Sequence, residues 1–473
     1  MQFGSQTPRT TSLIPSIVCF QEGKVLVGTS VKENFNRLRE ATENTVVRSV
    51  KRHFLDPNWS VVLPSGKLLS ADEVAGEILK EVQTEIRRSV GFPIERAVLT
   101  VPLKFSAQER RLLRKAAEHA DVDVLSFVHE PFAALISAIA HRKDGAYLLL
   151  DWGGGTLDVT LAKKDAHLVF ELAHLGLDRA GDDVDAALGE YILQQSGLPL
   201  LAELPSLSRD KLLVACEKAK IELSEHAEAT IAIPVFLKDK PLLQTITRAN
   251  FDRVCDPIVG QVMETLLKVV DSAQIEDYSL ASIFLAGGSV QIPLLKRRLE
   301  ERFGGRLELL DRPQQRIAEG AAIAAHFALE PLLAKPIAVQ LSDPSVKEAR
   351  FLPLLERGQI LSDNLRVATE LRILREDGAR NPGILRLYEG NAEPSWSSRF
   401  ERQVGEATIP IEAENLPKHF QDTVRLECLY MGHDGELVVL ADARSRKLQQ
   451  QAVYLSDICY GVDLSRYEEQ SGS

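Results

Sequence analysis

The chain has 473 residues, of which 45% are hydrophobic and 26% charged, and its formal net charge is −11. This length exceeds what one core supports, so two or three domains are expected. The acidic balance argues against broad nucleic-acid binding, because neutralising phosphates requires a basic surface. The sequence shows no apolar run of membrane length and no signal segment, so we expect a cytoplasmic protein without a membrane partner. The five cysteines form no CxxC pair, which indicates reduced, buried thiols rather than a disulfide framework or a metal site.

The first part of the chain predicts a strand pair and a basic segment. Residues 16–20 and 25–28 are short strand-like runs separated by a Glu22-Gly23 turn. Residues 44–54 predict a short helix or an extended segment that contains Lys51 and Arg52. Composition alone favours solvated surface charge for both, and contact with an anion is the alternative.

Residues 70–140 predict an alternation of helices and strands. Residues 70–88 have helical spacing of apolar side chains and a cap at Ser70 or Asp72. A strand at 97–101 stops at Pro102, and Ser106 caps a helix whose surface is expected to carry Arg110.

A second strand, at residues 124–128, ends in His129-Glu130-Pro131 before an apolar helix at 132–140. A carboxylate at such a strand tip is well placed to face a ligand crevice. A helix N-terminal acid favoured by the dipole is the alternative for Glu130.

Residues 147–160, YLLLDWGGGTLDVT, predict a phosphate-binding hairpin. Three glycines, Gly153, Gly154 and Gly155, allow a sharp turn whose amide groups can approach phosphate oxygens. Asp151 and Asp158 flank this turn and suit a hydrated Mg²⁺ or an attacking water, and Thr156 can donate to a phosphoryl oxygen. An ordinary hairpin with a glycine turn is the alternative for the glycines alone.

The character of the chain changes after residue 325. Residues 329–335 are short and apolar, with Pro331 inside them, as in an interdomain linker. Beyond them we expect strands at 351–356, 365–374, 383–387, 407–411, 424–431 and 436–441. A turn at 432–435 joins the last two strands into a hairpin. Residues 467–473 predict a polar, frayed tail.

Several separated blocks resemble the Hsp70 chaperone family, whose nucleotide domain shares the fold of actin. They are TPRTT, NTVVRSVKR, LTVPLKFSAQERR, VHEPFAALISA, LLLDWGGGTLDVT, AGDDVD, EKAKIELS, FLAGGSVQIP and EGAAIAA, and they span residues 7–325. The resemblance implies an α/β, actin-like (ribonuclease H-like) two-lobed ATPase domain followed by a small β-sandwich. It places the nucleotide domain at residues 1–328, a linker at 329–336, a substrate-binding-like β-sandwich at 337–465 and a polar tail at 466–473.

The resemblance also implies roles for individual residues. Asp151, Asp158 and Glu130 would lie at Mg²⁺, Thr156 at the terminal phosphate, and Lys51 at the attacking water. Nucleotide contacts are implied for Gly153, Gly154, Gly155, Gly181, Glu217, Lys220, Ser224, Gly287 and Gly288. Pro102 and Arg110 match the pair proposed to pass the nucleotide state to the neighbouring domain.

The sequence departs from the family at several points. The first phosphate motif, a strand–turn–strand with an aspartate and a threonine, has no counterpart before Thr7, and the helical lid after the β-sandwich is missing as well. Gln291 stands where an arginine is usual, and Gln314 and Gln315 stand where acids are usual. ATP hydrolysis is therefore an expectation that these departures weaken.

The function expected from the resemblance is that of an ATP-dependent chaperone with ATP or ADP and Mg²⁺ as cofactors. Its partners would be unfolded or extended peptide segments and J-domain and nucleotide-exchange co-chaperones. A non-hydrolysing actin-like scaffold or regulatory binding protein is the alternative. A sugar kinase on the same fold explains neither EKAKIELS nor the β-rich C-terminal part.

Overall fold

The computed structural model describes residues 13–41, 43–237, 240–273, 279–327, 329–341, 350–362, 365–375, 383–390, 402–409, 420–431, 436–443, 451–455 and 458–471. The TPRTT block at residues 7–11 and the expected turn at 432–435 lie outside these residues. None of the described helices is long and apolar enough to cross a membrane.

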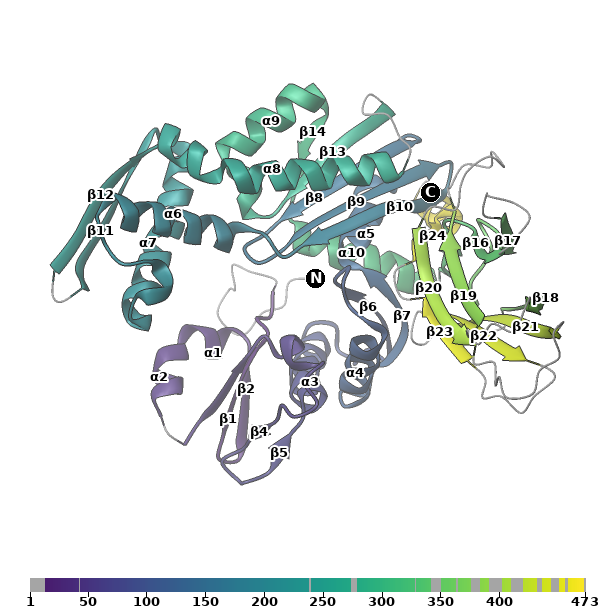
Figure 1. Cartoon of the computed structure of the whole chain (residues 1–473). Coiled ribbons are helices and arrows are strands. Elements are labelled where there is room, and N and C mark those ends of the chain that lie inside the picture. The colour runs from purple at the N-terminus through teal and green to yellow at the C-terminus, as the bar shows by residue number, and fades with distance from the viewer. Residues whose placement is uncertain are drawn as a thin grey trace.

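The N-terminal part, purple in Figure 1, holds a small antiparallel sheet with helices beside it. The sheet order is β2-β1-β3, and Val18 and Phe20 of β1 point into its core. Its elements are β1 (Ile17–Gln21), β2 (Lys24–Val27), α1 (Thr29–Glu33), α2 (Phe35–Glu40), β3 (Thr45–Arg48), η1 (Val50–His53), β4 (Val61–Val62), β5 (Leu68–Leu69) and α3 (Ala71–Val90). Ser70 begins α3 with the capping box that the sequence predicts.

A parallel strand pair and two helices come next. They are β6 (Arg96–Val101), α4 (Ala107–Glu118), β7 (Asp123–His129) and α5 (Glu130–Ile139). The Ser106 hydroxyl accepts from the Glu109 amide, which confirms the predicted start of α4. Arg110 corrects the expectation of a surface residue, because it is 2% exposed and its guanidinium lies beside His129.

A seven-stranded sheet with the order β14-β13-β8-β9-β10-β24-β15 forms the centre of the molecule (Figure 1). Its strands are β8 (Gly145–Trp152), β9 (Leu157–Asp165), β10 (Leu168–Leu177), β13 (Leu280–Ala286), β14 (Leu307–Leu309), β15 (Leu332–Leu333) and β24 (Tyr460–Asp463). Alternate side chains of β8 enter two cores, Leu148 and Leu150 on one face and Tyr147 and Leu149 on the other. Helix α8 packs on the first face and α5 on the second.

The remaining elements of this region include a separate two-stranded sheet, β11-β12, on which α7 packs. They are α6 (Gly181–Gln195), η2 (Leu201–Glu203), α7 (Ser206–Glu225), β11 (Glu228–Leu237), β12 (Lys240–Thr247), α8 (Arg248–Ser272), η4 (Gly288–Gln291), α9 (Pro293–Phe303), η5 (Gly304–Arg306) and α10 (Pro313–His326).

The C-terminal part forms two four-stranded sheets, β17-β16-β19-β20 and β18-β21-β22-β23. Leu387 of the first and Leu426 of the second are fully buried in one shared core. The strands are β16 (Ile337–Leu341), β17 (Arg350–Leu355), β18 (Arg366–Arg375), β19 (Gly383–Glu389), β20 (Arg402–Ile409), β21 (Phe420–Met431), β22 (Glu436–Ala443) and β23 (Gln451–Leu455). Five of the six strands expected after residue 350 are confirmed to within a few residues. The strand expected at 407–411 overlaps only the end of β20, and residues 410 and 411 lie outside the described residues.

The end of the chain returns to the central sheet. Strand β24 falls within the expected β-sandwich range of 337–465, yet it pairs with β10 on one side and with β15 on the other. The expected frayed tail instead contains helix α11 (Ser465–Ser471), where Glu468 pairs with Lys164 and Tyr467 hydrogen-bonds to His141.

Candidate functional site

The glycine-rich stretch forms a tight β-hairpin between β8 and β9. Asp151 and Asp158 are directly opposite each other in the ladder, and the Gly153 amide donates to the Thr156 carbonyl over 3.0 Å. Because directly opposed residues of a ladder point to the same face, the two carboxylates share one side of the hairpin. The turn between them is half-exposed at Gly153 and exposed at Gly154 and Gly155.

Glu130 adds a third carboxylate from the first residue of α5. Burial and, to a lesser extent, the negative charges of Asp158 and Glu130 together raise the pKa of Asp151 to about 6. Burial also raises the pKa of Asp158, while a hydrogen bond from the Thr156 side chain lowers it. Mg²⁺ usually binds one or two carboxylates together with water and substrate phosphate. The described donor atoms of Asp151, Asp158 and Glu130 do not all lie within 4.8 Å of one another, so the residues fit a magnesium ion that is held partly through water.

The start of α6 and the Ser289 side chain form hydrogen bonds with the carbonyl groups of the hairpin turn. The Gly153 carbonyl accepts from the Gly181 amide over 3.0 Å and from the Ser289 hydroxyl over 2.7 Å. The Asp182 amide donates to the Gly154 carbonyl over 2.8 Å. A side chain at Gly181 would place its Cβ 2.5 Å from the Ser289 hydroxyl, so only glycine permits this approach. The first turn of a helix, with its partial positive charge, thus lies against the turn of the hairpin.

Gly287 and Gly288 follow β13, the strand that runs parallel to β8. Gly287 has a φ of +84°, and a Cβ on it would overlap the Trp152 carbonyl and lie 2.8 Å from the Asp151 carboxylate. Gly288 has open space around its Cβ position. Gly287 therefore lies against the Asp151 carboxylate, whereas the Cβ position of Gly288 has no neighbour within 4 Å.

The helix α7 carries the three residues expected at an adenosine. Lys220 donates to the Gly181 carbonyl over 3.0 Å and to Asp185 over 2.7 Å, so it ties α7 to α6 behind the hairpin. The Ser224 hydroxyl donates to the Lys220 carbonyl, and Glu217 is exposed. Lys220 thus binds α6 next to the hairpin, and among the described residues no hydrogen bond or ion pair joins Glu217 or Ser224 to the hairpin.

Lys51 and Lys104 differ in whether the structure connects them to the carboxylates of the hairpin. Lys51 is exposed on η1, and within the described residues no hydrogen bond or ion pair joins it to the hairpin. Lys104 follows Pro102 and forms an ion pair with Asp178 at 2.9 Å, and its charge lowers the pKa of Asp158. The sequence predicts no role for Lys104, because none of its neighbours in the chain indicates that its charge acts on Asp158.

The chain matches the family model described as Hsp70 protein over residues 5–339. It is 30% identical over 328 residues to a protein named "Chaperone protein DnaK" from Nitrosopumilus maritimus, which covers 66% of this chain and 50% of the relative. Proteins of the same name from Halobacterium salinarum and Thermus thermophilus are also 30% identical, over 325 and 344 residues. These matches cover 67% and 66% of this chain and 50% and 55% of the relatives. The chain spans about half the length of the curated relatives it matches.

Proposed function

This chain belongs to the Hsp70 family, with an actin-like α/β nucleotide domain, and on that premise we propose that it binds and hydrolyses Mg-ATP to control its binding of extended apolar peptides. The observation that carries the proposal is the pairing of Asp151 with Asp158 across a glycine turn, electrostatically coupled to Glu130. A terminal phosphate with its cation requires such an arrangement of backbone amides on one side and carboxylates on the other.

The proposed magnesium ligands, directly or through water, are Asp151, Asp158 and Glu130. Bound there, the ion would neutralise phosphate charge that these carboxylates would otherwise repel. Asp158 accepts a hydrogen bond from Thr156, which fixes the hydroxyl at the turn. A ligand that neutralises the carboxylates would free this hydroxyl to donate to a phosphoryl oxygen.

The remaining proposed roles concern nucleotide and water. Gly153, Gly154 and Gly155 would offer their backbone to the phosphates, with Gly181 holding the turn in place. Glu217, Lys220 and Ser224 would contact the adenosine beside Gly287 and Gly288. Lys51 would orient the attacking water, a role that brings η1 toward the hairpin when nucleotide binds.

The two C-terminal sheets support a peptide-binding role, because each four-stranded sheet has two edge strands that can pair with an extended segment. The proposed partners are unfolded segments with J-domain and nucleotide-exchange co-chaperones. We also propose a cytoplasmic location and domain limits at residues 1–328, 329–336, 337–465 and 466–473, except that β15, β24 and α11 belong with the central sheet of the first domain.

Nucleotide binding is tested by calorimetric titration of the full chain with Mg-ADP and with ADP plus a chelator. Asp158→Asn should abolish most of the difference between the two titrations, because it removes one of three carboxylates at the ion. Asp165→Asn is the matched control, since Asp165 is exposed at the other end of the same strand. No binding heat in the folded wild type, or equal loss in both variants, would overturn the proposal.

Hydrolysis is tested separately by steady-state phosphate release. Thr156→Ala should lower the rate by about a hundredfold if its hydroxyl stabilises the transferred phosphoryl group. Wild type that binds Mg-ATP but releases phosphate at the background rate would instead support the non-hydrolysing scaffold.

A further inference from the structure

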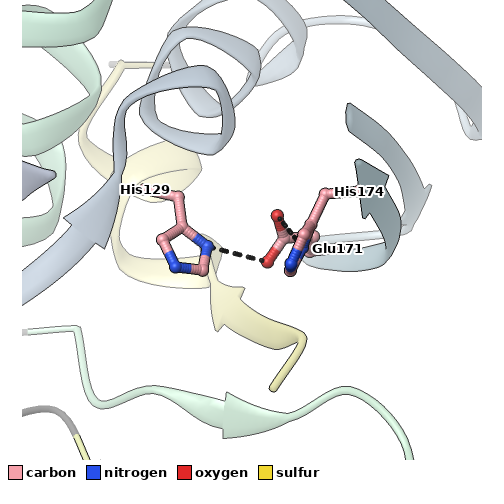
Figure 2. A group of neighbouring side chains, drawn as sticks. All are labelled: His129, Glu171 and His174. Atoms are coloured by element: carbon pink, nitrogen blue, oxygen red, sulfur yellow. Dashed lines mark hydrogen bonds and ion pairs between the residues drawn. The ribbon is translucent and has the colours of Figure 1, made fainter. Parts of the chain in front are cut away.

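Two histidines and a glutamate meet in the interior, where His129 directly precedes Glu130. Figure 2 shows His129, from the end of β7, and His174, from β10, directed at the carboxylate of Glu171. The Nδ1 atoms of His129 and His174 lie 3.4 Å and 3.0 Å from the two carboxylate oxygens. The side chains are 3%, 4% and 0% exposed, and one donor atom of each lies within 4.8 Å of the others.

We propose that His129, Glu171 and His174 bind a Zn²⁺-class divalent ion, with the Cys459 thiolate as fourth ligand. This inference does not rest on the proposed nucleotide function. Imidazole nitrogen, carboxylate oxygen and thiolate sulfur are the ligands that Zn²⁺ takes in proteins, usually four in a tetrahedron. With zinc–nitrogen and zinc–oxygen bonds of about 2.0–2.1 Å, neighbouring ligands of a tetrahedron are about 3.3 Å apart. The 3.0 Å and 3.4 Å separations run to different oxygens of Glu171, so the carboxylate must turn one oxygen toward both nitrogens when the ion binds.

Cys459 supplies the sulfur from a different part of the chain. Its Sγ lies 4.0 Å from the His174 Nδ1, and its amide donates to Glu389. A sulfur bonded to the same ion at about 2.3 Å would lie about 3.5 Å from that nitrogen. Cys459 must move toward His129 and Glu171 to close the site, because its sulfur is not within 4.8 Å of all three donor atoms. A small cavity of about 30 Å³ adjoins His129 and Glu171, which is room for one ion or water.

The competing explanation is a hydrogen-bonded network without metal. The Arg110 guanidinium lies 3.3 Å from the His129 Nε2, and since arginine can only donate, that nitrogen accepts and Nδ1–H donates to Glu171. Metal binding at Nδ1 moves the imidazole proton to Nε2 and releases the thiol proton to solvent, so the Arg110 contact must open. The metal-free network and the metal-bound site therefore differ in bound metal, in the Arg110–His129 contact and in the protonation of Cys459.

The first test is the metal content of the full chain. Wild type is loaded with Zn²⁺, dialysed and analysed by mass spectrometry, and its affinity is measured by competition with a chromogenic chelator. We expect one Zn²⁺ per chain, and a loss of affinity of about 100-fold or more in His174→Ala. His226→Ala is the matched control, because His226 is exposed at the end of α7 and should keep the metal. Substoichiometric metal in folded wild type, or full retention in His174→Ala, would overturn the proposal.

The second test uses the wild-type protein, so its main result does not depend on whether His174→Ala folds. Co²⁺ replaces Zn²⁺ in the wild type, where a sulfur ligand gives an intense near-ultraviolet charge-transfer band and a tetrahedral site gives strong visible bands. We expect both, and Cys459→Ser should remove the first band while Cys428→Ser, at a buried thiol of the C-terminal sheets, keeps it. An octahedral spectrum without the sulfur band would leave only the hydrogen-bonded network.

Discussion

At the scale of single residues, the neighbouring glycines Gly287 and Gly288 should respond differently to substitution by alanine. Gly287→Ala puts a Cβ into the Trp152 carbonyl at a positive φ, so it should lower the free energy of unfolding by about 1 to 3 kcal/mol. Gly288→Ala meets open space and should stay within about 0.5 kcal/mol of wild type. Thermal unfolding without nucleotide checks both, and equal stabilities would show that the close approach of β13 to β8 is not as described.

Asp185 gives a pH dependence at the same scale. Burial raises its pKa to about 6 despite the hydrogen bond and charge of Lys220. Between its ordinary value of 3.8 and about 6, the folded chain keeps a proton that the unfolded chain has released, so stability falls as pH rises through this window. Asp185→Asn removes this dependence. The melting temperature of wild type relative to Asp185→Asn should therefore fall from pH 4 to pH 6 and then level off.

The control for this measurement is Asp165→Asn, which changes an exposed aspartate. It should parallel the wild-type melting curve across the whole range. A difference between wild type and Asp185→Asn that rises with pH would contradict the direction assigned to Asp185.

At the scale of elements, α5 and α10 touch backbone to backbone. Gly320 of α10 lies where a Cβ would overlap the Ala133 carbonyl of α5, and the Ser137 hydroxyl donates to Glu319 beside it. Gly320→Ala should therefore cost about 1 to 3 kcal/mol, since the helices must separate. Gln314→Ala, at an exposed position in the first turn of α10, should leave denaturant unfolding nearly unchanged. An unaffected Gly320→Ala would mean that the helices can shift freely.

Features formed by neighbouring residues could be predicted from the sequence, whereas contacts between distant segments could not. The hairpin at Asp151 was predictable because its strands, glycines and carboxylates are adjacent in the chain, and the Ser106 cap because its partner is three residues away. Lys104 was missed because its partner Asp178 lies on a different strand connection. His129, Glu171 and Cys459 come from three distant segments, so no spacing in the sequence brings them together. Strand β24 has only four residues, too few for a periodic signal.

At the scale of the whole molecule, the chain connects the central sheet to the two C-terminal sheets twice, once after β15 and once before β24. Gly461 of β24 lies against the Phe170 ring, where a Cβ would overlap it. Gly461→Leu should release β24 and loosen β15, which pairs with β24 in the sheet and with residues 358–361 outside it. Hydrogen exchange should then accelerate in both strands together, by tenfold or more for each ~1.4 kcal/mol lost.

The matched control is Gly305→Ala, which meets open space beside the same sheet. It should leave exchange in β15 and β24 at the wild-type rate. Accelerated exchange in β24 alone would show that the backbone hydrogen bonds of β15 with residues 358–361 suffice to hold it without β24.

The place of β24 between β10 and β15 also sets an order of assembly during synthesis. The pairing of Lys164 with Glu468 joins positions 304 residues apart, so the ribosome must make both C-terminal sheets before this edge of the central sheet can close. Until then β10 presents an unpaired edge that can recruit a strand from another chain. The nascent protein, itself a relative of chaperones, would be most exposed to misassembly during that interval.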